Sequence, residues 1–304
     1  MDKKVGMFLS SFANADLEST ISDISTKTVL IGSVLLVLLV IAALLWSQRH
    51  PKTKAPIFGL ILVVVLGTTL TISGGTIYLN VKSATGGPVH WHADVEFWAC
   101  GNELELRDPQ GVLSNKIGTP TLHEHNDKRI HLEGVPVELP QDASLGKFMD
   151  VVGGDVTNHT LIVPVNEGDD LFENGEGEED GDGNGAPAPE LVQQFLRTSS
   201  DGRVATFVGG QSCEGEPAEV QVFAYQLDET SKTYHQKKLD NPSRYEIGKH
   251  GEVPPGDCVI FEFAPPKDRT DKLCKQYGVR DIDRCEQFGV PASGRHVCEI
   301  REVR

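Results

Sequence analysis

The sequence predicts two N-terminal transmembrane helices followed by an extracytoplasmic α+β domain that is mostly β and contains disulfides. Three observations lead to this fold class. Two apolar runs lie within the first 79 residues, segments of alternating apolar and polar residues begin at residue 89, and all six cysteines follow the second run. An unbroken apolar run of about 18 residues or more indicates a membrane span, whereas alternation indicates a half-buried strand.

The apolar runs are each long enough to cross a hydrocarbon core of about 30 Å at about 1.5 Å per residue. Arg49, Lys52 and Lys54 lie between the runs, whereas only Lys82 follows closely after the second. Positive charges favour the cytoplasmic side. We therefore expect a plasma-membrane protein with both termini and the large C-terminal domain outside. The predicted segments are a polar N-terminal tail (1–28), spans (29–46 and 57–79), a basic cytoplasmic loop (47–56) and a tether (80–88).

The cysteines are six in number and are confined to one side of the predicted membrane. An even number in that position predicts up to three disulfides in an oxidising compartment. Fifteen pairings remain open, of which Cys274 with Cys285 is the most local. The candidates are Cys100, Cys213, Cys258, Cys274, Cys285 and Cys298.

The soluble domain, residues 89–275, opens with a strictly alternating segment at 89–98. One face of this predicted strand is apolar, and the other carries His90, His92, Asp94 and Glu96. A solvated strand face more commonly carries Thr, Ser and Lys. Because residues i and i+2 share a face of a strand, the two histidines are expected side by side.

Two further segments repeat this pattern. His123 and His125 flank Glu124, and His131 follows in a short alternating segment with Glu133. Five histidines within 42 residues favour a divalent metal over a purely structural polar face. The predicted ligands are His90, His92, His123, His125 and His131, and Asp94, Asp127 and Glu133 are predicted as additional ligands or as groups that orient the histidines.

Neutral imidazole suits zinc, Cu(II) and nickel, whereas Cu(I) carriers favour methionine and thiolate ligands. The chain contains only three methionines. We therefore expect zinc or Cu(II) as the cofactor. Calcium is disfavoured, although residues 180–185 resemble the start of an EF-hand loop, because Leu191 occupies the position that requires a bidentate Glu.

The sequence of the rest of the domain predicts one helix and several strands. Ser144 is a candidate N-cap for a helix over 145–152, and Gly153 ends it. The segment 167–190 contains ten acidic residues among glycines and predicts a disordered insertion. Residues 276–304 form a charged, cysteine-containing tail. Further strands are expected near 104–107, 160–165, 204–208, 220–227 and 258–263.

Three pieces of the chain together resemble an uncharacterised family of His-rich extracytoplasmic domains found in prokaryotic lipoproteins and membrane-anchored proteins. They are His90-Trp91-His92, the stretch from His123 to Glu133, and Ser144-Leu145-Gly146-Lys147-Phe148. The resemblance covers about residues 88–275 and implies a membrane-tethered domain without a defined activity. The order of its elements also resembles a β-grasp arrangement. Many relatives have Thr in place of Glu124, so this acid is a departure from the pattern.

The net charge of −16 and pI near 5.0 argue against a nucleic-acid partner, since phosphate binding requires a basic surface. The membrane and a cell-surface or envelope protein are the expected partners. A metal-binding module is the favoured function. The alternatives are a surface interaction or scaffolding protein with structural histidines, and a metal-dependent hydrolase or oxidoreductase in which Glu124 or Asp94 is the general base.

Overall fold

A computed structural model describes the chain over residues 17–46, 51–109, 115–139, 141–166, 193–199, 202–228, 233–248, 256–275, 292–293 and 297–298. The predicted acidic insertion at 167–190, which includes the segment that resembles a calcium loop, lies outside these residues. Cys285 in the tail also lies outside them. The chain divides into two compact units, residues 1–88 with 135–137, and residues 89–134 with 138–304.

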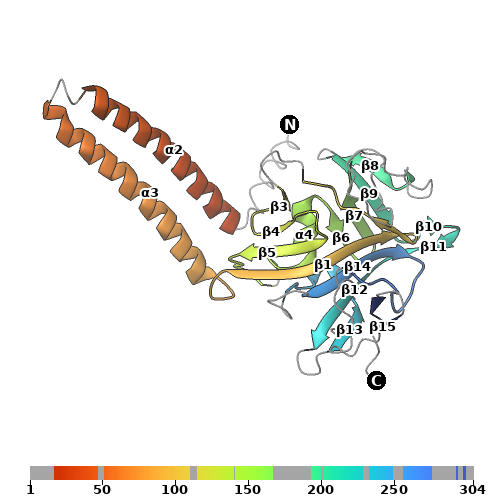
Figure 1. The fold of residues 1–304 in the computed structure, drawn as a ribbon. Helices are drawn as coiled ribbons and strands as arrows, with labels where there is room; N and C mark the ends of the chain where they lie inside the picture. The colour runs from red at the N-terminus through yellow and green to blue at the C-terminus, as the bar shows by residue number, and fades with distance from the viewer. Residues whose placement is uncertain are drawn as a thin grey trace, which may run out of the picture. The chain divides into compact units, whose positions relative to one another are not determined.

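The first unit contains a hairpin of two long helices, α2 (Leu17–Trp46) and α3 (Lys54–Lys82), which run antiparallel in Figure 1. A 3-10 turn, η1 (Pro51–Thr53), precedes α3. Both helices are long and apolar enough to cross a membrane, as predicted. They approach closely at Gly32, where an added Cβ atom would lie 2.5 Å from Thr68 Oγ1. Small residues permit such close packing between apolar helices.

Helix α2 begins 12 residues before the predicted span, at Leu17 rather than at residue 29. Residues 17–28 of the predicted polar tail are therefore helical. The physical reason is that helical hydrogen bonds are local, so a change from polar to apolar side chains does not end a helix. No Gly or Pro interrupts residues 17–28. Asp23 also pairs with Lys27 one turn later, at 2.6 Å.

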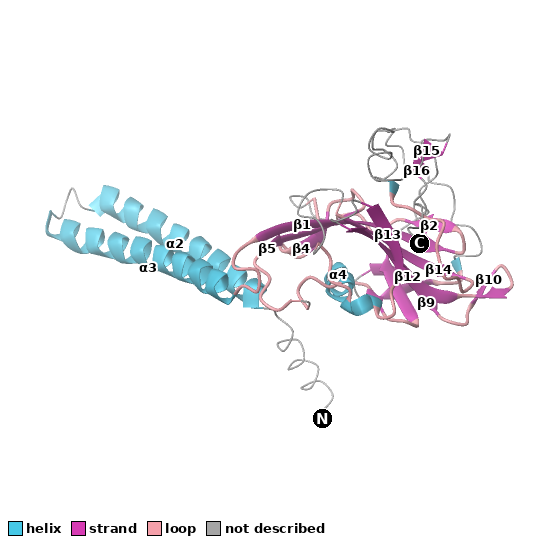
Figure 2. Cartoon of the chain, turned by 90° about the horizontal axis from the view of Figure 1, so that it is seen from below, coloured by secondary structure: helices cyan, strands magenta, loops and turns pink. Residues whose placement is uncertain are grey.

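The second unit is mostly β-sheet, as Figure 2 shows by colour. Its larger sheet has the strand order β13-β12-β14-β1-β5-β4-β3, and β2 pairs with β1. Strand β1 runs parallel to β14 and antiparallel to β5. The strands are β1 (Val89–Ala99), β2 (Asn102–Leu104), β3 (Ile117–Gly118), β4 (Leu122–Glu124), β5 (Arg129–Gly134), β12 (Glu219–Asp228), β13 (Thr233–Lys238) and β14 (Asp257–Ala264).

A smaller sheet has the order β6-β7-β9-β8. Its strands are β6 (Asp155–Val156), β7 (Thr160–Pro164), β8 (Leu196–Ser199) and β9 (Gly202–Val208). The other described elements are the pairs β10 (Ser212–Cys213) with β11 (Glu216–Pro217) and β15 (Ala292–Ser293) with β16 (Val297–Cys298), and the 3-10 turn η2 (Pro242–Arg244). The strand predicted at 104–107 is realised as the shorter β2, which begins two residues earlier.

Helix α4 (Leu145–Val152) has both predicted ends. The Ser144 side chain accepts a hydrogen bond from the Lys147 backbone N–H, and Gly153 adopts a left-handed conformation at the C-terminal end. The apolar side of α4 packs into the main core with one face of the larger sheet. That core includes Phe148 and Met149 from α4, Phe97 from β1 and Phe261 from β14.

The opposite face of the larger sheet has a different composition. Around β12 and β14 it carries a smaller apolar cluster that includes Phe223, Tyr225 and Ile260, with Trp98 packed against it. Around β1, β5 and β4 the same face carries histidines, because alternate residues of a strand point to one side. The alternation predicted for 89–98 therefore decides where the histidines lie.

Two disulfides join elements of this domain. Cys100 pairs with Cys213, and Cys258 pairs with Cys274. The most local pairing considered from the sequence, Cys274 with Cys285, is therefore wrong, because Cys274 lies beside β14 rather than turning back on its own tail. Two apolar helices followed by a mostly β domain with disulfides are confirmed, whereas the β-grasp arrangement stays a prediction.

Candidate metal site

The register of three neighbouring strands brings the predicted histidines together. On β1 and β5, His92 lies directly opposite His131. On β5 and β4, His131 lies directly opposite His123. Directly opposite residues on adjacent strands have Cβ atoms about 5 Å apart on the same face. These three imidazoles therefore form a row across the sheet, with His131 at its centre.

The remaining two histidines lie beside the two ends of this row, two residues along the chain from His92 and His123, and the ring of His125 is also centred 4.9 Å from that of His131. The ring of His90 is centred 4.5 Å from that of His92, and the ring of His125 is centred 4.7 Å from that of His123. Two groups of three result, in each of which the potential ligand atoms lie within 4.8 Å of one another. The first group is His90, His92 and His131, and the second is His123, His125 and His131.

His131 is oriented by a carboxylate. Its Nε2 lies 3.1 Å from Asp127 Oδ2. Burial raises the pKa of Asp127, but the hydrogen bond and charge of His131 outweigh that effect and lower it overall. An ionised carboxylate only accepts, so Nε2 carries the proton and Nδ1 retains the lone pair. A carboxylate that fixes a histidine in this way is the usual support of a metal ligand.

His125 is oriented by a backbone carbonyl. Its Nδ1 lies 2.8 Å from the carbonyl oxygen of Asn115, which can only accept a hydrogen bond. Nδ1 therefore carries the proton, and the Nε2 lone pair points to His123 Nε2 at 3.0 Å. Two nitrogen ligands on one tetrahedral zinc lie about 3.3 Å apart, given Zn–N bonds of about 2.0–2.1 Å. The separation of His123 and His125 is close to that value.

Glu133 lies between the two groups. Its Oε1 is 3.0 Å from His90 Nε2 and 3.9 Å from His131 Nδ1. Its Oε2 is 3.9 Å from His123 Nε2. One carboxylate thus faces a nitrogen from each end of the row, and it places negative charge where a cation would be bound.

Burial keeps two of the imidazoles neutral. Desolvation, followed by the neighbouring His131 and His90, lowers the pKa of His92 to about 4. Desolvation, followed by Lys116 and His125, lowers the pKa of His123 to about 4. Imidazole must be neutral to bind a metal, so these two ligands are ready at neutral pH. His90 is the exposed end of the row, with a side chain 62% exposed.

The ring nitrogens themselves fit a metal ion. Among the described residues, the buried Nδ1 atoms of His92, His123 and His131 have no hydrogen-bond partner. Leaving a buried polar atom unsatisfied costs about 1–3 kcal/mol, and such atoms are rare in folded proteins. A divalent ion that takes the Nδ1 lone pairs of His92 and His131 would remove this cost for those two residues, whereas His123 turns its Nε2 towards His125 and Glu133. The donor set of imidazole and carboxylate is also the one that zinc and Cu(II) accept.

Other predicted residues have different positions. Asp94 shares the histidine face but accepts a hydrogen bond from Arg129 Nε at 2.7 Å. Glu124 lies on the opposite face of β4 from His123, and its Oε1 accepts the backbone N–H groups of Asp127 and Lys128. Neither acid belongs to the two histidine groups.

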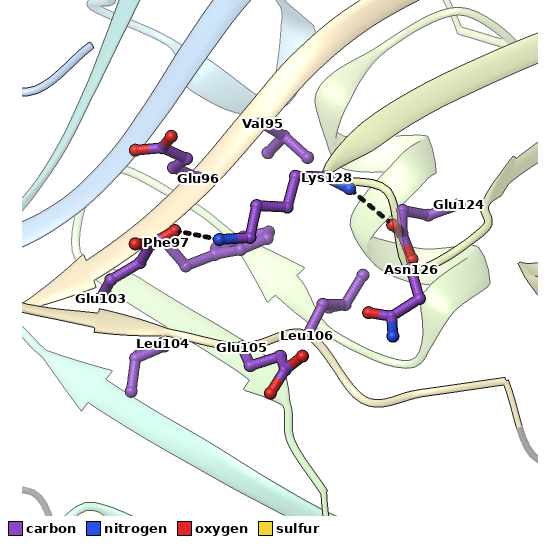
Figure 3. A pocket seen from close by; sticks show the side chains of 10 residues that line it. All are labelled: Val95, Glu96, Phe97, Glu103, Leu104, Glu105, Leu106, Glu124, Asn126 and Lys128. Atoms are coloured by element: carbon purple, nitrogen blue, oxygen red, sulfur yellow. Dashed lines mark hydrogen bonds and ion pairs between the residues drawn. The ribbon is translucent and has the colours of Figure 1, made fainter. Parts of the chain in front are cut away.

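Glu124 instead lines a cavity of about 20 Å³ beneath the β4–β5 turn. Figure 3 shows Lys128 between two acids. The backbone N–H of Lys128 donates to Glu124, and the Lys128 side chain donates to Glu103 at 2.7 Å. Burial, followed by the neighbouring Glu103, raises the pKa of Glu96, another residue at this cavity. The volume suits one water molecule rather than an organic substrate.

Sequence reasoning missed two supporting residues. Asn115 contributes through its backbone carbonyl, which leaves no signal in a side-chain pattern. Arg129 pairs with Asp94 because the two lie directly opposite on β5 and β1. Both residues flank histidine segments in the sequence. Their pairing can be recognised only when the register of β1 and β5 is known.

Comparison of the chain with protein-family models, curated proteins and solved structures finds no match.

Proposed function

We propose that this protein is a membrane-anchored, extracytoplasmic module that binds zinc or Cu(II) through histidines of neighbouring strands. The observation that carries the proposal is the row of His92, His131 and His123, in which the buried Nδ1 atoms of His92 and His131 have no hydrogen-bond partner among the described residues. A structural polar face would be expected to pair such atoms with donors. Metal ligation gives each of them a role.

The location of the module follows from the two apolar helices and the disulfides. Disulfides persist in oxidising compartments, which favours an extracytoplasmic sheet domain. The basic loop between the helices favours a cytoplasmic turn and external termini. Membership of the His-rich extracytoplasmic family is part of this proposal and is supported by the histidine segments and the Ser144–Phe148 stretch.

A hydrolytic function lacks a comparable observation. Of the two bases considered for it, Glu124 is engaged by the backbone of the β4–β5 turn beside a cavity that is too small for a substrate, and Asp94 is paired with Arg129. The interaction-protein alternative differs from the metal proposal in one measurable respect, because it requires a folded domain that takes up no metal.

The test uses the full chain, produced with its disulfides, solubilised in detergent, stripped with a chelator and dialysed against Zn²⁺ or Cu²⁺. Metal content by mass spectrometry is compared with that of a His92→Ala/His125→Ala variant, which breaks both histidine groups. A His159→Ala/His235→Ala variant removes two histidines outside the site and is the matched control. We expect bound metal in the wild type and control, and its loss in the first variant. A folded wild-type protein that takes up neither ion would refute metal binding and favour the interaction protein.

A further inference from the structure

The histidine row contains more ligands than one ion uses. Zinc is bound by four ligands in structural sites and by three protein ligands in catalytic ones. The row offers five imidazoles, with Glu133 and Asp127 beside them. Neither group of close ligand atoms combines His90 or His92 with His123 or His125. The two ends of the row therefore belong to different coordination shells.

Each end also has its own buried ring nitrogens that could bind a cation. Among the described residues, the first group contains a buried, unpartnered Nδ1 on His92, and in the second group the Nε2 atoms of His123 and His125 lie 3.0 Å apart. His92 and His123 are at least nine-tenths buried, with exposed fractions of 9% and 0%. An ion held by His123 and His125 would leave the Nδ1 atom of His92 without a partner, so a second ion is needed at the first group.

The negative charge is placed to hold two ions together. The two oxygens of Glu133 face different groups, Oε1 towards His90 and Oε2 towards His123. Carboxylates that contact two ions in this manner are typical of paired-metal sites, where they offset the repulsion between the cations. His131 is common to both groups, and its one free lone pair, on Nδ1, can bind one of the two ions.

We infer that the site binds two divalent transition-metal ions side by side, one in each histidine group, with Glu133 bridging them. This inference rests on the proposed function and adds the stoichiometry and the bridge. The second group is the more buried, since His123 is 0% exposed whereas the His90 side chain is 62% exposed. The ion at His123 and His125 is therefore expected to bind first and more tightly.

The experiment measures how many Zn²⁺ ions the chelator-stripped full chain binds, by calorimetric titration and by metal content at saturation. The wild type is expected to bind two ions per chain in two resolved phases. His90→Ala and His125→Ala each remove a ligand of one group only, so each variant is expected to retain one ion. His159→Ala, outside the site, is the matched control and should retain two.

The bridge is tested with Cu²⁺ as the probe. Two adjacent Cu²⁺ ions joined by a carboxylate give a magnetically coupled spectrum in electron paramagnetic resonance. Glu133→Gln keeps the size of the side chain and removes its charge, and it is expected to abolish the coupling and weaken the second ion at least about 10-fold. His90 and Glu133 are partly exposed, so these variants should fold, which circular dichroism would verify.

The outcomes separate the two proposals. One ion per wild-type chain, or two ions without magnetic coupling, overturns the inference of a bridged pair and leaves the metal-binding function standing. No bound ion in a folded wild-type chain overturns both. Two coupled ions, reduced to one by either single histidine substitution, support the pair.

Discussion

At the residue scale, the position of His131 determines what the site can do. It follows the two His-x-His pairs in the sequence, yet β5 lies between β1 and β4 in the sheet. The last histidine in the chain order thus becomes the central one in space. Its proton is fixed by Asp127, which leaves the lone pair of Nδ1 for one metal ion.

Burial of the metal-free histidines predicts an acid-sensitive domain. The pKa values of His92 and His123 are lowered to about 4 in the folded chain, against about 6.5 in an unfolded one. Below about pH 6.5 the unfolded chain binds protons at these rings that the folded chain does not. The free energy of unfolding should therefore be fully present above pH 6.5 and should fall towards pH 4.

Denaturant unfolding of the chelator-stripped protein at pH 7.5, 6 and 5 measures this effect. Carboxylates also titrate near the lower end of the range, so a His92→Gln/His123→Gln variant isolates the histidine contribution. Its stability should fall less between pH 7.5 and 5 than that of the wild type. Equal losses in the two proteins would show that burial of these rings does not perturb their protonation.

At the element scale, the N-cap that the sequence predicts for helix α4, Ser144, can be tested directly. Ser144 Oγ accepts the Lys147 N–H at 3.1 Å, which satisfies one of the free donors at the helix start. Ser144→Ala should lower the free energy of unfolding by about 1 kcal/mol, because that donor loses its partner. Ser144→Asp, which can still cap, is the control. Unchanged stability in the alanine variant would mean that water replaces the cap at no cost.

Local patterns were sufficient to find these elements. Alternation predicted β1 and β5, apolar runs predicted β7, β12 and β14, and the Ser144 and Gly153 signals gave both ends of α4. Strand β13 was missed because Thr233–Lys238 is mostly polar and pairs only through β12 at the sheet edge. The order of the strands could not be predicted, since backbone pairing between distant segments leaves no periodic signal.

The candidate site likewise combines features that local sequence patterns predict with features that depend on how the strands pair. The five histidines were identified from spacing on single strands, and the structure gathers all five. The role of Glu124 depends on which face it occupies, and side-chain alternation in β4 turns it away from its histidine neighbours. Asp94 is on the correct face, but the Arg129 opposite it forms an ion pair that only the register reveals.

At the scale of the whole molecule, the two disulfides constrain very different lengths of chain. Cys100 and Cys213 are separated by 113 residues, whereas Cys258 and Cys274 are separated by 16. The longer link joins the end of β1, which carries His90 and His92, to the β10 strand much later in the chain. The shorter link fixes the segment after β14 to that strand.

Chain entropy predicts that the longer link contributes more stability. Closing a loop lowers the entropy of the unfolded chain in proportion to the logarithm of loop length, which gives about 5 kcal/mol for Cys100–Cys213 and about 3 kcal/mol for Cys258–Cys274. Cys100→Ala/Cys213→Ala should therefore destabilise the sheet domain by about 2 kcal/mol more than Cys258→Ala/Cys274→Ala. Trp91 and Trp98 lie in β1, so their fluorescence during denaturant unfolding of the full chain reports on this domain. If the Cys258–Cys274 pair proved the more costly to remove, local packing around β14, where Cys258 is fully buried, would outweigh loop entropy.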